Sequence, residues 1–183
     1  MTVRKLGVVA SIVLWSALVA IGAGTLYAYE GTPGERGTTP PRWPTASALP
    51  HDGITIAMFV HPECPCTRAS IAELAAAISA KAPATLVVVV EGDPAEIADR
   101  LRALPSARIV TDAGVEAARF GAKTSGHVVA YDARGSLAFS GGITPGRGHV
   151  GDNMGRRSLE RILAGGSAVD PTRAVLGCEL EAR

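Results

Sequence analysis

Two cysteines, Cys64 and Cys66, flank Pro65 in the stretch HPECPCTRAS. A deprotonated cysteine is both a nucleophile toward disulfides and a soft metal ligand. Two cysteines separated by one residue therefore indicate either a redox pair or a metal site. A pair of buried structural thiols is the third interpretation.

The elements on either side of the pair place it at the start of a helix. Residues 54–60 form an apolar run typical of a buried strand, and residues 65–80 repeat apolar side chains at helical spacing. Pro65 suits the first position of a helix. The positive end of a helix stabilises a thiolate and lowers a cysteine pKa from its usual value of about 8.5. We therefore predict Cys64 at or beside the N-cap as the nucleophile, and Cys66 in the first turn.

A disulfide between Cys64 and Cys66 would be strained, because residues two apart in a helix point to opposite sides. Strained disulfides have high reduction potentials, so the pattern predicts a pair that gives disulfides away or isomerises them more readily than it reduces partners. Cys64 would attack and Cys66 would resolve. Cys178 makes the count of thiols odd, which in an exported protein suggests exchange. We expect it either to resolve one of the pair or to be a small buried residue of the C-terminal tail.

A metal site is the competing prediction for the same stretch. His61, Cys64 and Cys66 form the pattern HxxCxC, and two thiolates with one imidazole suit copper(I). The chain would then be a copper metallochaperone. A structural zinc needs four ligands, and only His127 or His149 is in prospect as the fourth. The redox interpretation requires no cofactor, whereas the alternative requires copper.

The rest of the chain alternates strand and helix signals. Strands are expected at residues 85–91, 108–112, 127–132 and 137–140, and helices from Asp93 to Leu104, from residue 113 to a stop at Gly121, and from Asp152 or Asn153 to Gly165. The DARGS turn predicts an antiparallel hairpin. The order βαβ, an inserted helix and strand, then ββα predicts an α/β fold with a mixed sheet and flanking helices.

A glycine-rich loop at residues 141–153 follows the last predicted strand, which by this topology returns to the cysteines. The polar side chains it would bring there are Thr144, Arg147, His149 and Asp152. Of these, Arg147 or His149 could stabilise the Cys64 thiolate. The loop also contains GRGHVG, a literal GxGxxG. No βαβ unit with a later acidic residue follows it, so we expect no nucleotide site.

The N-terminal residues 6–29 contain no charged side chain and are long enough to span a membrane. Arg4 and Lys5 precede this run, so the positive-inside rule places the N-terminus in the cytoplasm and the rest of the chain in the periplasm or outside the cell. We expect an uncleaved single-pass anchor. A cleaved signal peptide is the competing interpretation.

Composition divides the chain into four expected parts. They are a membrane anchor at residues 1–29, a flexible linker at 30–50, a domain at 51–166 and a C-terminal tail at 167–183. Glycine, proline and threonine dominate the linker, in which we expect Trp43 to be loosely held. With a net charge of +1 and 19% charged residues, no basic surface indicates nucleic acid as a partner.

A cysteine pair between the first strand and the first helix, in this order of elements, resembles the thioredoxin fold over residues 54–164. The stretches HPECPCTRAS, FGAKTSGHVVAYD and SGGITPGRGHVGDNMG are similar, more narrowly, to the bacterial, membrane-anchored RedB-like proteins. The resemblance to thioredoxins implies a thiol–disulfide oxidoreductase. Because the N-terminal segment places the domain outside the cytoplasm, we expect its partners to be thiols or disulfides of exported proteins.

The sequence departs from the thioredoxin pattern at two places. Thioredoxins have two residues between their cysteines and a cis-proline facing them, whereas here Pro65 is the whole spacer and the matching loop reads Thr124, Ser125, Gly126. The resemblance implies that this loop offers backbone hydrogen bonds to a bound chain. His61 stands where peroxiredoxins have a threonine, which disfavours a peroxidase.

Overall fold

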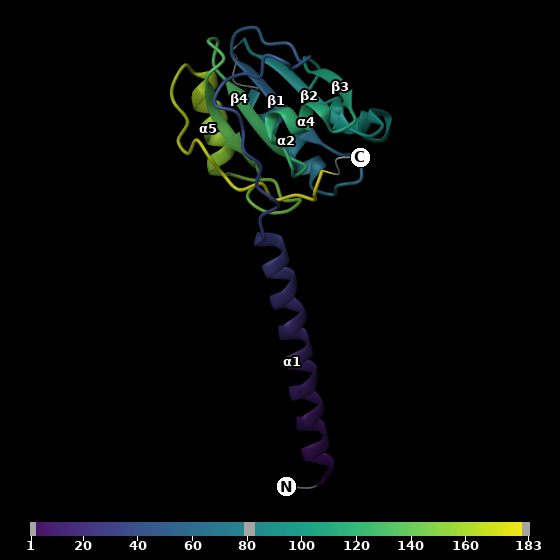
Figure 1. Cartoon of the computed structure of the whole chain (residues 1–183). Coiled ribbons are helices and arrows are strands. Elements are labelled where there is room, and N and C mark those ends of the chain that lie inside the picture. Colours follow the sequence, from purple (N-terminus) through teal and green to yellow (C-terminus); the bar gives the residue numbers. More distant parts are fainter. Residues whose placement is uncertain (1–2, 79–82, 181–183) are drawn as a thin grey trace. The chain divides into compact units, whose positions relative to one another are not determined.

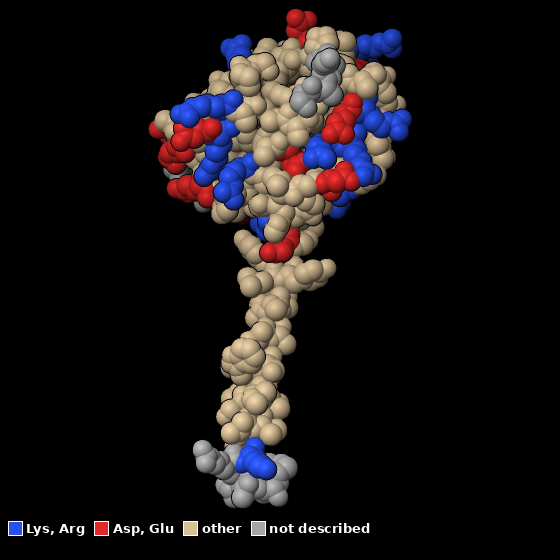
Figure 2. Space-filling view, turned by 180° about the vertical axis from the view of Figure 1, so that it is seen from behind, with Lys and Arg blue, Asp and Glu red and all other residues tan. Residues whose placement is uncertain are grey.

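The computed structural model describes residues 3–78 and 83–180 and divides the chain into two compact units, Met1–Thr32 and Pro33–Arg183. The first unit is the helix α1, Val3–Gly31. Its stretch Gly7–Gly31 has 25 residues, about 37 Å of helix, which exceeds the ~30 Å core of a bilayer. Figure 2 shows α1 free of charged side chains between its two ends. The predicted N-terminal apolar helix is thus present, with the length and composition of a membrane span.

The second unit is built on one five-stranded sheet with helices packed against it (Figure 1). The strands are β1 (Thr55–Val60), β2 (Thr85–Glu91), β3 (Arg108–Asp112), β4 (His127–Tyr131) and β5 (Leu137–Gly141). In the order β3-β2-β1-β4-β5, the first three strands are mutually parallel, and β4 is antiparallel to both β1 and β5. A βαβ unit and a ββα unit that share one mixed sheet make a thioredoxin-like fold, which confirms the predicted fold class.

The central strands are buried on both faces because helices and loops cover the sheet from two sides. The helices are α2 (Thr67–Ile78), η1 (Pro94–Ile97), α3 (Ala98–Leu101), α4 (Val115–Phe120) and α5 (Met154–Leu163). Alternate residues of β1 enter two separate cores. Met58 packs in the core that includes residues of α2 and α5, and Phe59 packs in the core that includes Phe120 of α4. This double burial explains the apolar runs of β1 and β2.

The helix ends follow the expected signals. Asp93 caps η1 by accepting from the backbone of Ala95, and Asn153 caps α5 by accepting from Arg156. Gly121 ends α4 in a left-handed conformation. Some boundaries differ. α2 begins at Thr67 rather than at residue 65, and its predicted last two residues lie outside the described residues. The helix predicted from Asp93 to Leu104 is the 3-10 helix η1 followed by the short α3, which ends at Leu101.

The expectation of a flexible linker is wrong for residues 33–50, which pack against the domain. The Tyr131 hydroxyl donates to the Pro40 carbonyl at 2.8 Å, and Leu137 N–H donates to the Pro41 carbonyl at 2.9 Å. The Trp43 ring stacks on the His51 imidazole at a centroid distance of 4.6 Å and meets the Phe120 ring edge-on at 4.9 Å. The glycine and proline content of this segment predicts that it forms no regular helix or strand. It does not predict whether the segment packs against the domain.

The C-terminal segment is likewise part of the domain rather than a slack tail. Arg173 N–H donates to the Ser140 carbonyl at 3.0 Å, so the segment lies along β5. Leu180, 7% exposed, joins the core that contains Phe120. The folded unit therefore extends well past residue 166, and this extension carries the third cysteine into the site.

Candidate functional site

The turn that carries the cysteine pair lies between β1 and α2. Cys64 N–H donates to the His61 carbonyl at 3.3 Å, and the Cys66 carbonyl accepts from Ser70 N–H at 3.0 Å. That second bond is the first of the helical i to i+4 pattern, so Cys66 holds the N-cap position and Cys64 lies two residues before it. The predicted placement was two residues too early. Both cysteines precede the helix, where their backbone is free of helical geometry.

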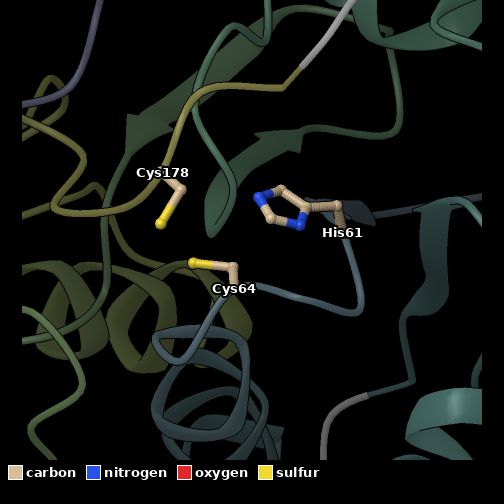
Figure 3. A group of neighbouring side chains, drawn as sticks. All are labelled: His61, Cys64 and Cys178. Atoms are coloured by element: carbon tan, nitrogen blue, oxygen red, sulfur yellow. The ribbon is translucent and has the colours of Figure 1, made fainter.

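The structure brings His61, Cys64 and Cys178 together. One imidazole nitrogen and the two sulfur atoms all lie within 4.8 Å of one another. Figure 3 shows the two sulfurs facing each other, with the His61 ring beside them. The metal-ligand set expected from the sequence was His61, Cys64 and Cys66. Cys178 therefore takes the position that the sequence pattern gave to Cys66.

Cys178 reaches this place because residues 178–180 pair with residues 123–125. Ser125 N–H donates to the Cys178 carbonyl and Leu180 N–H to the Lys123 carbonyl, both at 2.8 Å, around an antiparallel bridge. A Cβ on Gly177 would lie 2.0 Å from the Ser125 carbonyl oxygen. Glycine is therefore required beside Cys178 for the two segments to approach so closely.

Ser125 ties the pairing to the cysteine turn. Its hydroxyl accepts from His61 N–H at 3.1 Å, and the Thr67 hydroxyl, 3.3 Å away, donates to the His61 carbonyl at 2.8 Å. Gly126 N–H donates to the Phe59 carbonyl at 2.8 Å. These bonds fix the end of β1, the start of α2 and the loop before β4 in one arrangement.

Cys64 is the cysteine that this arrangement favours as a thiolate. Burial raises the pKa of the Cys64 thiol, but hydrogen bonds to its sulfur outweigh that effect and lower the pKa below its usual value. They come from the backbone and thiol of Cys178, the backbone of Cys66 and the hydroxyl of Ser125. The low pKa of Cys64 is therefore caused by hydrogen-bond donors that surround its sulfur in the folded structure.

The two neighbouring thiols are held in the protonated form. Burial raises the pKa of Cys66 to about 11, and the charge and sulfur of Cys64 add to the rise. Burial and then the hydrogen bond to Cys64 raise the pKa of Cys178, against which the Arg147 guanidinium acts in the opposite direction. The site therefore favours the thiolate form at Cys64 and the protonated form at the two neighbouring sulfurs.

The predicted pair is covered, and the third cysteine is the accessible one. Cys64 is 1% exposed and Cys66 is 4% exposed. Cys178 is partly exposed and lies over Cys64. In this arrangement the Cys64 side chain is closed to an external disulfide, and the segment that carries Cys178 lies against it.

The glycine-rich loop lies beside the cysteines, although its side chains act elsewhere than expected. The Arg147 guanidinium donates to the Gly177 carbonyl at 2.5 Å, so its charge acts on Cys178 rather than on Cys64. The backbone of Gly148 makes a hydrogen bond with Cys66. His149 N–H closes a turn onto the Gly146 carbonyl at 3.2 Å. The loop therefore acts on Cys66 through the Gly148 backbone and on Cys178 through the Arg147 guanidinium.

The remaining expected side chains are Thr144, Asp152 and His127. Thr144 is buried, and Asp152 pairs with the guanidinium groups of Arg156 and Arg157 on α5. The ring of His127, 5% exposed, has its Nε2 2.9 Å from the Ser140 hydroxyl, so this nitrogen is engaged away from the cysteines. Burial lowers the pKa of His127 to about 4.

The sequence reading missed Glu73, which anchors the glycine-rich loop to α2. Its carboxylate, on a residue 2% exposed, accepts from Gly151 N–H at 2.5 Å, from the Asn153 amide at 3.3 Å and from the Arg156 guanidinium at 2.8 Å. The sequence feature that could have identified it is a single acidic residue within the alanine-rich helix α2. Its role is to hold the loop next to Cys66.

A cavity of about 440 Å³ opens beside His61. Six carboxylates line it, those of Glu63, Glu91, Asp93, Glu96, Asp112 and Glu179. Elsewhere, the face of the domain shown in Figure 2 carries acidic and basic side chains interleaved. A chain that approaches His61 through this cavity meets a field that favours cationic groups.

No protein-family model matches the chain, and no curated protein matches it. Among solved structures, the chain is similar to a hypothetical protein of Sinorhizobium meliloti, with 17% identity and a TM-score of 0.57 over 81% of this chain and 93% of that one. It is similar to an uncharacterized conserved protein of Geobacillus kaustophilus, with 15% identity and a TM-score of 0.57 over 83% and 93%. A secreted Mycobacterium tuberculosis disulfide oxidoreductase, homologous to E. coli DsbE, has 19% identity and a TM-score of 0.47 over 63% and 83%. At these identities the first two matches establish a shared fold.

Proposed function

We propose that this chain exchanges disulfides with exported proteins, using Cys64 as the nucleophile. The observation that carries the proposal is the site itself, in which a thiolate-favouring cysteine lies between two thiols whose pKa values are raised. A thiolate is the attacking species in disulfide exchange, and a nearby thiol is needed to complete it. Disulfide exchange of this kind uses cysteine sulfurs alone and requires no metal or cofactor.

The exchange runs in two displacements. The Cys64 thiolate attacks one sulfur of a partner disulfide, that S–S bond breaks, and the other partner sulfur leaves as a thiolate. A neighbouring thiol, Cys66 in the prediction from sequence, then gives up its proton and attacks the Cys64 sulfur. The second partner sulfur leaves, so the partner gains two electrons and the protein holds one new disulfide. The same steps in reverse oxidise a partner dithiol.

The N-terminal helix supplies the proposed location. A single-pass anchor whose N-terminus is cytoplasmic, as Arg4 and Lys5 favour, places the domain in the periplasm or outside the cell. Disulfides persist in those compartments. Kinship with the RedB-like proteins stays part of this proposal and is supported by the three sequence stretches that resemble them.

The test uses the full chain in detergent with scrambled ribonuclease and with insulin as partners. We expect Cys64-dependent isomerisation or reduction, lost in Cys64→Ser and retained in Ala46→Ser, a linker residue on an exposed turn. Equal activity of the wild type and Cys64→Ser would refute the proposal. A partner cysteine trapped on Cys64 in the Cys66→Ser, Cys178→Ser double variant would identify the nucleophile directly.

The second candidate function is copper(I) delivery. Two sulfurs and one imidazole nitrogen within 4.8 Å suit the two- and three-coordinate geometry of copper(I), and the structure favours His61, Cys64 and Cys178 over the set that contains Cys66. We expect one equivalent of copper(I) to survive dialysis against a weak chelator in wild type and Cys66→Ser, and to be lost in Cys178→Ser. Retention in Cys178→Ser would refute this ligand set.

A further inference from the structure

The loop that should bind a partner chain is already paired with a segment of the same chain. The backbone groups of residues 123–125 that face this segment are Ser125 N–H and the Lys123 carbonyl, and both bond to residues 178–180 at 2.8 Å. The antiparallel bridge joins Thr124 to Glu179. This is the geometry of an added strand, in which main-chain bonds hold an extended peptide.

The pairing places a cysteine of the segment opposite the nucleophile. Cys178 is the first residue of the paired stretch 178–180, and its sulfur faces the Cys64 sulfur (Figure 3). An extended peptide bound at the same edge for disulfide exchange would have to present its own sulfur at this point, because the attack requires contact with Cys64.

The side chains next to Cys178 fit the surface on which they lie. Leu180 is 7% exposed and packs in the core that contains Leu49 and Phe120. Gly177 lies where a Cβ would collide with the Ser125 carbonyl oxygen. Val175, 8% exposed, accepts from Gly34 N–H at 2.8 Å. The segment is therefore seated by a defined pattern, a glycine before the cysteine and an apolar residue two positions after it.

We propose that residues 175–180 occupy, within the same molecule, the binding place of a substrate chain, with Cys178 in the position of the reacting substrate sulfur. This inference rests on the proposed exchange function. It names the substrate class as extended, cysteine-containing segments with a small residue before the cysteine and an apolar residue two after it. It also makes the segment a lid that must leave before such a substrate reaches Cys64.

The lid is also the resolving group. Once a substrate has displaced the segment and Cys64 holds a mixed disulfide, the returning segment brings the Cys178 thiol to the Cys64 sulfur. Cys178 loses its proton and attacks, the bond from Cys64 to the substrate sulfur breaks, and that sulfur leaves and is protonated. The protein ends with a Cys64–Cys178 disulfide, and the substrate disulfide has gained two electrons and two protons. A partner dithiol resets the protein by the reverse exchange.

The first test measures iodoacetamide labelling of Cys64 in the reduced full chain, read by peptide mass mapping. Leu180→Ala should label Cys64 at least about tenfold faster, because truncating a buried leucine shifts a local opening equilibrium by that factor or more. Val169→Ala, in the same tail but 41% exposed, is the matched control and should label at the wild-type rate. The peptide AVLGSEL, which copies residues 174–180 with serine for Cys178, should slow labelling of Leu180→Ala again.

The result that overturns the inference is equal labelling of Cys64 in wild type and Leu180→Ala, with no effect of the peptide. Far-ultraviolet circular dichroism and Trp43 fluorescence establish that the variant is folded. The second test oxidises Cys66→Ser with glutathione disulfide. A Cys64–Cys178 bond is expected, and its failure to form removes the resolving role. If Cys64-dependent exchange is present but both results are negative, this inference fails while the proposed function stands.

Discussion

Replacing Glu73 by glutamine should destabilise the domain far more than its conservative chemistry suggests. The carboxylate is 2% exposed and accepts bonds from the Gly151 backbone and the Arg156 guanidinium at 2.5 and 2.8 Å. Glutamine keeps one acceptor oxygen but turns an NH₂ group toward one of these donors. Hydrogen bonds to a charged group contribute about 1.5–3 kcal/mol each, and breaking a buried ion pair costs about 3–5 kcal/mol.

The expected loss in the free energy of unfolding is about 2–4 kcal/mol. It is smaller than the full cost of breaking a buried ion pair because Arg156 keeps its contacts with Asp152 and Glu160. Urea unfolding of the detergent-solubilised chain, followed by Trp43 fluorescence, measures it. Glu160→Gln is the matched control, since it removes a charge from the same arginine at a side chain 39% exposed, and should cost under ~0.5 kcal/mol.

An equal loss in the two variants, or a loss for Glu73→Gln within about 0.5 kcal/mol of zero, would refute the assignment of Glu73 as the buried anchor of the glycine-rich loop. A second readout follows from the position of the loop. Because the Gly148 backbone makes a hydrogen bond with Cys66, loosening the loop should raise the alkylation rate of Cys66 in Glu73→Gln and leave it unchanged in Glu160→Gln.

Three further predictions follow from the site and the core. The rate of Cys64 alkylation should rise with pH through a midpoint below that of a free cysteine. Ser125→Ala should move this midpoint upward, because one hydrogen-bond donor to the Cys64 sulfur is lost. An unchanged midpoint would contradict the role of the Ser125 hydroxyl as that donor. Burial lowers the pKa of His127 to about 4, so between about pH 6.5 and 4 the unfolded chain binds more protons than the folded chain. The free energy of unfolding should therefore fall by roughly 3 kcal/mol as the pH decreases through this window. His127→Gln should remove most of that slope, as urea unfolding at about pH 7.5 and 4.5 would measure, and an identical slope in the variant would exclude His127 as its source. Trp43→Ala should cost the domain about 2–3 kcal/mol by loss of its ring contacts with His51, Phe120 and Tyr131, whereas Trp15→Ala, in α1, should leave the unfolding of the domain unchanged.

The strands and helices of the domain were predictable because local patterns report local structure. The apolar runs of β1 and β2, the Asp93 and Asn153 caps and the stop at Gly121 each depend on neighbours in the sequence. The order of these elements then limits the topology to few arrangements. The fold class followed from the sequence for this reason, as did the position of the cysteine pair between the central strand β1 and the helix α2.

The segments on both sides of the domain were misjudged because their structure is not local. Residues 33–50 and 167–180 contain few helix or strand signals, yet they are held by bonds to Tyr131, Ser140 and Lys123, far away in the sequence. Backbone groups in extended segments find partners wherever the surface offers them. Such partners leave no periodic trace in the segment itself.

The amino-acid pattern was enough to predict a thioredoxin-like sheet with Cys64 near the start of a helix, and an apolar N-terminal span. The identity of the thiol that faces Cys64 depends on the folded arrangement. Cys178 reaches Cys64 through the pairing of residues 178–180 with residues 123–125, a contact between segments more than fifty residues apart. Spacing along the chain favoured Cys66 as the partner. The cage of donors that lowers the pKa of Cys64 is assembled by folding, because most of its members come from distant parts of the chain.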